Sequence, residues 1–310
     1  MLISCVVPAF NASTTIVRTL ASVFNTALPY GWSVEVLVVN DGSSDSAALA
    51  AVVGSYINTR LLVHETNRGT CAGRNTGIAA SRGDIVLLLD ADDELVPGWP
   101  EVINGVMNEW PKNTQVCYLK CRNLEGKVTA ENPSYSGALT LNDMLNERHS
   151  GEYIPLFRGD YLRQKQFIDL GLPMPCEVVS YINFAHDAPF WISNRILRIY
   201  HEGEVGSLSH DWTSQKKARA VAQCYFELFE RYGSLYQQEA PKVWNTKRLR
   251  LAVYLRLAAM PNAWSWWWAG ASFTCIKESV GALIILILGR KLGSKIAKLV
   301  KKIGLIRQYG

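Results

Sequence analysis

Short apolar runs alternate with amphipathic stretches along the first ninety residues of the chain. The apolar runs predict buried strands over residues 2–7, 34–39, 60–64 and 84–89. Between them, apolar residues at helical spacing, such as Ile16, Leu20 and Val23, predict helices. This alternation is typical of an α/β fold, in which right-handed crossover connections place the strands parallel to one another.

A polar loop follows each predicted strand at its carboxyl end. The loops carry Phe10 and Asn11 after the first strand, Asp41 after the second, Arg68 after the third and Asp90 after the fourth. Ligands of an open parallel sheet bind outside the carboxyl ends of its strands. We therefore expect these side chains to meet in one crevice.

Three carboxylates follow the fourth predicted strand, at Asp90, Asp92 and Asp93. They would repel one another unless a cation or hydrogen-bond donors compensated their charge. Oxygen ligands of this kind suit Mg²⁺ or Mn²⁺, which bridge protein carboxylates to substrate phosphates. The turn therefore indicates a divalent-ion site, and the alternative is an acidic turn that caps a helix starting near Pro97.

Other residues of the predicted crevice have side chains suited to a nucleotide. Asp41 can accept a hydrogen bond from a base or a ribose, and Phe10 can stack on a base. The guanidinium groups of Arg68 and Arg74 can reach base or phosphate oxygens. Each has a structural alternative, because Asp41 lies in an ordinary Asp-Gly-Ser-Ser turn, Phe10 can pack on the first helix, and either arginine can be a solvated surface charge.

Four motifs together resemble those of the family 2 glycosyltransferases. They read VVPAFN at 6–11, VNDGSSD at 39–45, NRG at 67–69 with AGRNTG at 72–77, and LDADD at 89–93. The resemblance implies the GT-A fold, a mostly parallel Rossmann-like sheet flanked by helices, and a nucleotide-sugar donor with a divalent metal at an Asp-x-Asp motif. By position, Asp41 would contact the base, Asp90 the ribose or the metal, and Asp92 the metal. Phe10, Asn11, Arg68 and Arg74 complete the predicted donor site.

The resemblance also implies inversion at the anomeric carbon, which needs a base to take the proton from the acceptor hydroxyl. The family often has a Glu-Asp pair before an apolar helix, and His186-Asp187 occupies the comparable region. Asp187 is therefore the predicted base, with Asp160 and Asp169 as substitutes. The structural alternative is that Asp187 caps a helix with Pro189 in its first turn. His201 lies in the segment that closes the site in the family and is a candidate contact of the metal or diphosphate.

The C-terminal third is predicted to be a helical and basic extension. Helical patterns cover residues 216–232 and 242–259, and a tryptophan cluster at 264–268 precedes the apolar run 280–288. Residues 290–310 hold seven basic residues and no acid, so the overall net charge of +5 leaves −2 for residues 1–289. The apolar positions Ile296, Leu299, Ile303 and Ile306 form a stripe beside the lysines 291, 295, 298 and 302. This pattern predicts an interfacial helix, so that residues 264–310 contact an anionic membrane. An oligomer contact or packing on the catalytic body are the alternatives.

A membrane span and nucleic-acid binding are both disfavoured. Lys277 and Glu278 would lie near the middle of a span over residues 269–289, and the body of the chain is almost neutral.

The seven scattered cysteines contain no CxxC pair and indicate reduced, mostly buried thiols, and residues 1–7 lack a cationic leader. We expect a cytoplasmic protein that is peripheral to the inner face of the cell membrane.

These observations predict a GT-A catalytic domain over residues 1–211, with a nucleotide-sugar half at 1–110 and an acceptor half at 111–211, and an extension over 212–310. We expect an inverting glycosyltransferase that uses Mn²⁺ or Mg²⁺ and glycosylates a hydroxyl of a lipid-linked glycan in surface polysaccharide synthesis. One alternative is a polyprenyl-phosphate sugar synthase, whose anionic acceptor needs no base. The other is a membrane-anchored nucleotide-sugar binding protein without catalysis.

Overall fold

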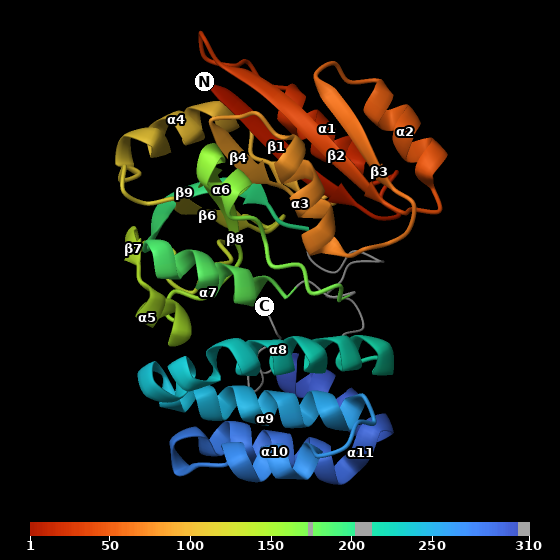
Figure 1. Ribbon diagram of the computed structural model, residues 1–310, viewed down its shortest axis with the longest axis vertical. Coiled ribbons are helices and arrows are strands. Elements are labelled where there is room, and N and C mark those ends of the chain that lie inside the picture. The colour runs from red at the N-terminus through yellow and green to blue at the C-terminus, as the bar shows by residue number, and fades with distance from the viewer. Residues whose placement is uncertain (173–175, 202–212, 303–310) are drawn as a thin grey trace. The chain divides into compact units, whose positions relative to one another are not determined.

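The computed structural model describes residues 1–172, 176–201 and 213–302, with side chains as far as residue 296. The chain divides into two compact units (Figure 1). The first comprises Met1–Met144 and Arg148–Glu204, and the second comprises Leu145–Glu147 and Val205–Gly310. The predicted domain boundary between residues 211 and 212 lies outside the described residues.

The first four strands are parallel and lie in the order β3-β2-β1-β4. They are β1 (Leu2–Ala9), β2 (Ser33–Asp41), β3 (Thr59–His64) and β4 (Ile85–Leu88), and the crossovers are α1 (Ile16–Phe24), α2 (Ser46–Gly54) and α3 (Thr70–Ala80). Alternate side chains of β1 enter two cores: Ile3 and Cys5 pack with α1 and α2, whereas Val6 packs with Ile78 of α3. The predicted α/β class and parallel half-sheet are confirmed.

The sheet continues from β4 with strands of mixed direction in the order β8-β6-β9-β5, and β7 pairs with β9. The strands are β5 (Glu94–Leu95), β6 (Val116–Arg122), β7 (Gly137–Leu139), β8 (Tyr153–Arg158) and β9 (Phe190–Ile199), and the helices are α4 (Trp99–Glu109), α5 (Leu141–Leu145), α6 (Gly159–Gln164) and α7 (Glu177–Asp187). The alternative that Asp187 caps a following helix is wrong. Asp187 ends α7, and the aromatic and β-branched residues after Pro189 form β9 on β6.

The second unit is helical, as predicted. It contains α8 (Gln215–Glu239), α9 (Pro241–Leu257), α10 (Ala263–Gly270), the short 3₁₀ helix η1 (Phe273–Cys275) and α11 (Ile276–Lys302). The side chain of Ser214 caps α8 by accepting a hydrogen bond from the backbone N–H of Lys217. The left-handed φ of 70° at Gly289 interrupts α11. Of the predicted apolar stripe, Ile303 and Ile306 lie outside the described residues.

All seven cysteines are buried, and none is paired with another in a disulfide. In the part of the chain that the structure describes, no single helix has both the length and the apolar composition of a membrane span.

Candidate functional site

The tips of the first parallel strands are joined by hydrogen bonds between their loops. The N–H of Asn11, after β1, donates to the Oγ of Ser43, after β2, at 3.0 Å. The Oδ1 of Asn11 in turn accepts from the N–H of Ser44 at 2.9 Å. Asn11 adopts a left-handed φ of 51°, a conformation that asparagine tolerates better than most residues. The loops after β1 and β2 therefore meet at one sheet edge, and a single crevice shared by all four loops stays a prediction.

Asp41, at the end of β2, organises the loop that follows β3. Its Oδ1 accepts from the N–H of Arg68 at 2.9 Å, and its Oδ2 accepts from the N–H of Gly69 at 2.8 Å. The Nδ1 of His64 lies 2.7 Å from the same Oδ1. Gly42 has a φ of 70°, and a Cβ there would come within 2.5 Å of the carbonyl carbon of Thr66, so the two loops approach too closely for a side chain. A base contact by Asp41 stays a prediction.

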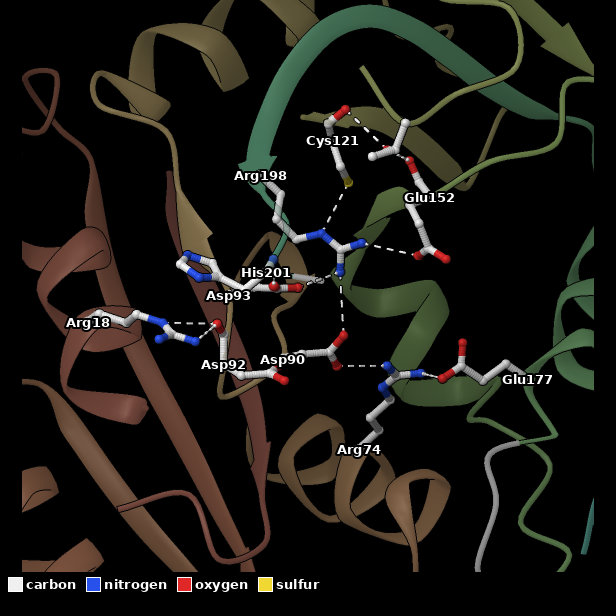
Figure 2. A network of polar contacts seen from close by, with 11 residues as sticks. Arg18, Arg74, Asp90, Asp92, Asp93, Cys121, Glu152, Glu177, Arg198 and His201 are labelled. Carbon is white, nitrogen blue, oxygen red and sulfur yellow. Dashed lines mark hydrogen bonds and ion pairs between the residues drawn. The ribbon is translucent and has the colours of Figure 1, made fainter. Parts of the chain in front are cut away.

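Asp90, after β4, lies between two buried arginines (Figure 2). Arg74 of α3 is 3.2 Å from Oδ1, and Arg198 of β9 is 3.4 Å from Oδ2. Arg74 also forms an ion pair with Glu177 in the first turn of α7. The Asp90 side chain remains 39% exposed, so it is open to a ligand while two cations hold it.

Sequence reasoning missed Arg198, which is the centre of this network. Its guanidinium group lies 3.1 Å from the Oδ2 of Asp93 and 3.4 Å from Glu152, and its Nε donates to the Sγ of Cys121 at 3.1 Å. Burial opposes its charge, but the neighbouring acidic groups outweigh that penalty and raise the pKa of Arg198 well above its usual value. The only signal in the sequence is a single charge within the apolar pattern of residues 196–199.

Asp93 is buried and stabilises the acidic turn itself, whereas Asp90 is exposed to a ligand. Its buried carboxylate accepts from the N–H of His201 through Oδ1 at 2.9 Å. Burial raises the pKa of Asp93 to about 7, with Arg198 opposing the shift and Asp90 adding to it. The Nε2 of His201 lies 2.8 Å from Glu94, so this ring already has a partner in the protein.

Asp92 is half-buried beside Asp90, and Arg18 of α1 donates to its backbone carbonyl at 3.1 Å. Among the described residues, no group of three or more His, Cys, Asp or Glu side chains is arranged to hold a metal ion. Mg²⁺ in nucleotide-dependent enzymes commonly needs only one or two carboxylates, with substrate phosphates and water as the other ligands. A divalent ion at Asp90 and Asp92, bound together with a diphosphate, therefore stays a prediction.

The structure does not bring Asp187 to this cluster. Asp187 ends α7 and accepts from the hydroxyl of Tyr161 at 2.8 Å and from Lys165. Tyr161 belongs to α6, whose first N–H, that of Gly159, donates to the carbonyl of Asp84 before β4. Asp187 therefore lies at the amino edge of β4, whereas Asp90 follows its carboxyl end.

Glu177 occupies the other end of α7, about 15 Å from Asp187 along the helix axis. Its ion pair with Arg74 places it beside Asp90. Burial raises the pKa of Asp187, but hydrogen bonds from Lys165 and Tyr161 outweigh this effect and hold that pKa below its ordinary value. The substitute Asp160 lies on α6, where it pairs with Arg163.

The side chains of Phe10 and Arg68, the two remaining predicted contacts of the donor, are exposed. Phe10 is 51% exposed after β1, and Arg68 is exposed in the loop that Asp41 holds. Their positions at the strand tips suit stacking and anion binding, and both roles stay predictions.

A parallel half-sheet whose tips carry acidic and guanidinium groups is typical of α/β proteins that bind nucleotides. Residues 4–164 match the family model of glycosyl transferase family 2, and the chain belongs to this family. The resemblance drawn from the four motifs is confirmed.

Several curated relatives match less than a third of the chain. ExoU, a succinoglycan biosynthesis protein of Rhizobium meliloti, is 41% identical over 95 residues, which are 30% of this chain and 27% of that protein. AmsB, an amylovoran biosynthesis glycosyltransferase of Erwinia amylovora, is 38% identical over 95 residues, covering 29% and 31%. The matched region thus spans about a third or less of these relatives.

A longer match extends beyond the nucleotide half. The Campylobacter jejuni GalNAc(5)-diNAcBac-PP-undecaprenol β-1,3-glucosyltransferase is 24% identical over 210 residues, which are 66% of each chain. The crystal structure of S. aureus TarS 1–349 with UDP-GlcNAc superposes with a TM-score of 0.59 at 16% identity, covering 91% of this chain and 80% of that one. This likeness confirms the predicted GT-A fold.

Proposed function

We propose that the protein transfers a sugar from a nucleoside diphosphate to a hydroxyl group of a glycan, with inversion at the anomeric carbon. The observation that carries the proposal is the half-open carboxylate of Asp90, held between Arg74 and Arg198 within a family 2 fold. This arrangement places acidic ligands and fixed cations together at the sheet edge where a nucleotide diphosphate binds.

The donor is a nucleotide sugar, for which the complex of TarS with UDP-GlcNAc offers support by analogy of fold. Phe10 would stack on the base, and Arg68 would reach the base or the phosphates. Asp41 has one Oδ2 lone pair left after its bond to Gly69 and would accept from the base. Asn11 holds the first two loops in register around this group.

Asp90 and Asp92 would hold Mg²⁺ or Mn²⁺ together with the donor diphosphate. The bound ion supplies charge neutralisation to the departing nucleoside diphosphate. Arg74 and Arg198 fix the orientation of Asp90 before the donor binds, because both guanidinium groups are buried and already paired with it.

Glu177 is placed to act as the base in the transfer. Its side chain is 28% exposed, and Arg74 holds it next to Asp90, where the donor sugar would meet the acceptor. The carboxylate would accept the proton from the attacking acceptor hydroxyl as that oxygen forms its bond to the anomeric carbon. Asp187, the base predicted from sequence, lies at the opposite edge of the sheet.

The acceptor is a growing glycan, lipid-linked in the synthesis of a surface polysaccharide. Two relatives carry names from succinoglycan and amylovoran biosynthesis, and the Campylobacter relative is named for an undecaprenol-linked acceptor. A lipid-linked acceptor fits an enzyme that is peripheral to the cytoplasmic face of the membrane, with residues 264–310 as its point of contact. Lys291 and Lys295 are exposed there and would face anionic headgroups.

Thermal shift with UDP- and GDP-sugars, with and without Mn²⁺, tests the donor, because a ligand raises the unfolding temperature by mass action. We expect one nucleotide class to stabilise the protein, more strongly with Mn²⁺, and Asp92→Asn to remove the metal-dependent part. A product assay with lipid-linked and soluble acceptors completes the test. Stabilisation without hydrolysis or transfer would indicate a binding protein, and transfer to a polyprenyl phosphate would indicate the synthase.

A further inference from the structure

Exposed hydrophobic side chains are concentrated in one stretch of the second unit. Of the fifteen large hydrophobic residues that are exposed in the described chain, eight lie between residues 264 and 292. Seven of them, on α10, η1 and the first part of α11, are 41–95% exposed: Trp264, Trp268, Phe273, Ile276, Val280, Ile284 and Ile287. We call α10, η1 and α11 as far as Gly289 the apolar hairpin. So much open apolar surface on consecutive elements marks an interaction site.

The exposed residues of α11 form one continuous stripe. Ile276, Val280, Ile284 and Ile287 follow one another at intervals of four, four and three residues, so they share one helix face. The opposite face carries Ile285 and other side chains that are fully buried in the second unit. The stripe runs for about 16 Å along the axis, so a helix lying flat on an apolar phase would present all of it.

The aromatic end of the hairpin is fixed in place. The indole N–H of Trp267 donates to the carbonyl of Ser279 at 2.9 Å, which ties α10 to α11, and Trp267 packs edge-on against Trp268 at 4.8 Å. Tryptophan is favoured where an apolar phase meets water. The charged residues from 264 to 289 are Lys277 and Glu278 alone, and the exposed Lys277 can extend its ammonium group to the aqueous side.

Past the interruption of α11 at Gly289, the chain turns from apolar to basic. A surface hollow of about 600 Å³ is lined by Arg290, Lys291 and Lys295, together with the polar side chains of Thr213, Ser214 and Gln215. Arg290 is held in position by its hydrogen bond to Gln215. Exposed apolar side chains and a cluster of cations in one unit match a phospholipid, which offers both acyl chains and an anionic headgroup.

We propose that the apolar hairpin lies in the interface of an anionic bilayer, with its stripe in the acyl region and the cations of the basic hollow on lipid phosphates. The inference rests on the proposed membrane location of the enzyme and goes beyond it. Burial of apolar side chains, rather than the charge of residues 290–310, supplies most of the attachment.

The test is co-sedimentation of the full chain with vesicles of phosphatidylcholine, alone or mixed with phosphatidylglycerol. The key variant is Val280→Glu/Ile284→Glu, and the matched control is Ile57→Glu/Leu124→Glu, which changes two residues of the first unit that are 85% and 67% exposed. We expect the key variant to bind vesicles at least about tenfold more weakly than the unaltered protein, and the control to bind them as the unaltered protein does. We also expect wild-type binding to the mixed vesicles to persist in high salt.

A third variant, Lys291→Glu/Lys295→Glu, separates charge from apolar burial. We expect it to weaken binding to the mixed vesicles and to leave the weaker binding to phosphatidylcholine unchanged.

If the apolar variant binds normally while the charge variant is released, the inference is overturned and the membrane location stands. If the unaltered protein binds neither vesicle, both fail. If light scattering shows that Val280→Glu/Ile284→Glu dissociates a dimer without changing vesicle binding, a second copy covers the face and the inference is overturned.

Discussion

At the residue scale, Arg198 compensates the charge of the acidic turn. Three carboxylates, those of Asp90, Asp93 and Glu152, lie within 3.4 Å of its guanidinium group. Burial raises the pKa of Glu152, and Arg198 opposes that shift. A buried charge is tolerated only when it is paired, so the arginine and its carboxylates depend on one another.

Replacing Arg198 should therefore destabilise the fold strongly. Arg198→Met leaves the three carboxylates without their shared partner, and we expect it to lower the free energy of unfolding by about 3–5 kcal/mol. Urea denaturation of the full chain measures this. Arg195→Met is the matched control, because Arg195 lies on the same strand and forms a half-exposed pair with Glu109, which is worth about 1 kcal/mol or less. Equal losses for the two variants would contradict a central role for Arg198.

The position of the base is tested by two conservative substitutions. We expect Glu177→Gln to lower kcat by roughly 10²–10⁴-fold, because the proton acceptor is lost. Donor affinity should change little, since the amide oxygen can still accept from Arg74. We expect Asp187→Asn to reduce kcat by less than about threefold. The reverse pattern would restore Asp187 as the base.

At the scale of elements, residues 145–147 have a defined role in the second unit. Glu147 accepts from Lys247 at 2.8 Å and from Arg250 at 3.0 Å, and both cations lie on α9. Burial raises the pKa of Glu147, but the two cations outweigh this effect and lower the pKa below its usual value. A carboxylate whose pKa is lower in the folded than in the unfolded protein stabilises the fold at any pH above its unfolded-state pKa. This stabilisation is lost as the pH falls through the folded-state pKa.

Glu147→Gln should thus destabilise the second unit at neutral pH. We expect a loss on the order of 3 kcal/mol at pH 7, because two largely buried cations lose their partner. The difference from the unaltered protein should shrink as the pH falls below about 4, where the unfolded carboxylate is protonated. Denaturant titrations across this range measure it. Glu227→Gln, which breaks an exposed pair with Arg231 on α8, is the control and should change stability little at any pH. A loss that does not depend on pH would rule out the ion-pair explanation.

At the scale of the whole molecule, the proposed donor site and the proposed membrane contact belong to different units. Hydrogen exchange with a nucleotide sugar and Mn²⁺ should protect backbone amides in the loops after β1, β2, β3 and β4, where Asn11, Asp41, Arg68 and Asp90 lie. The helices α8 to α11 should exchange as they do in the free protein. Protection confined to those helices would contradict the proposed site.

Much of the first unit could be predicted because its local signals agree with its tertiary structure. Apolar runs of strand length and amphipathic helices alternate, so the parallel strands β1 to β4 and the positions of Asn11, Asp41 and Asp90 after their carboxyl ends follow from the sequence. The second half was harder, because its strands run in mixed directions and pair out of chain order. The base is an example: the sequence suggested Asp187, whereas Arg74 brings Glu177, at the other end of α7, beside Asp90, and periodicity does not predict this long-range contact.

The sequence by itself determined the α/β class, the family, the acidic turn at residues 90–93 and the helical, basic character of the extension. These properties depend on residues that are close in the chain, so spacing and composition carry them. Only the tertiary structure decided that Arg198 and Glu177 join Asp90, that Asp187 lies at the other sheet edge, and which face of α11 is exposed. Each of these features depends on contacts between residues far apart in the chain. Strand pairing and packing determine such contacts, and local sequence patterns do not predict them.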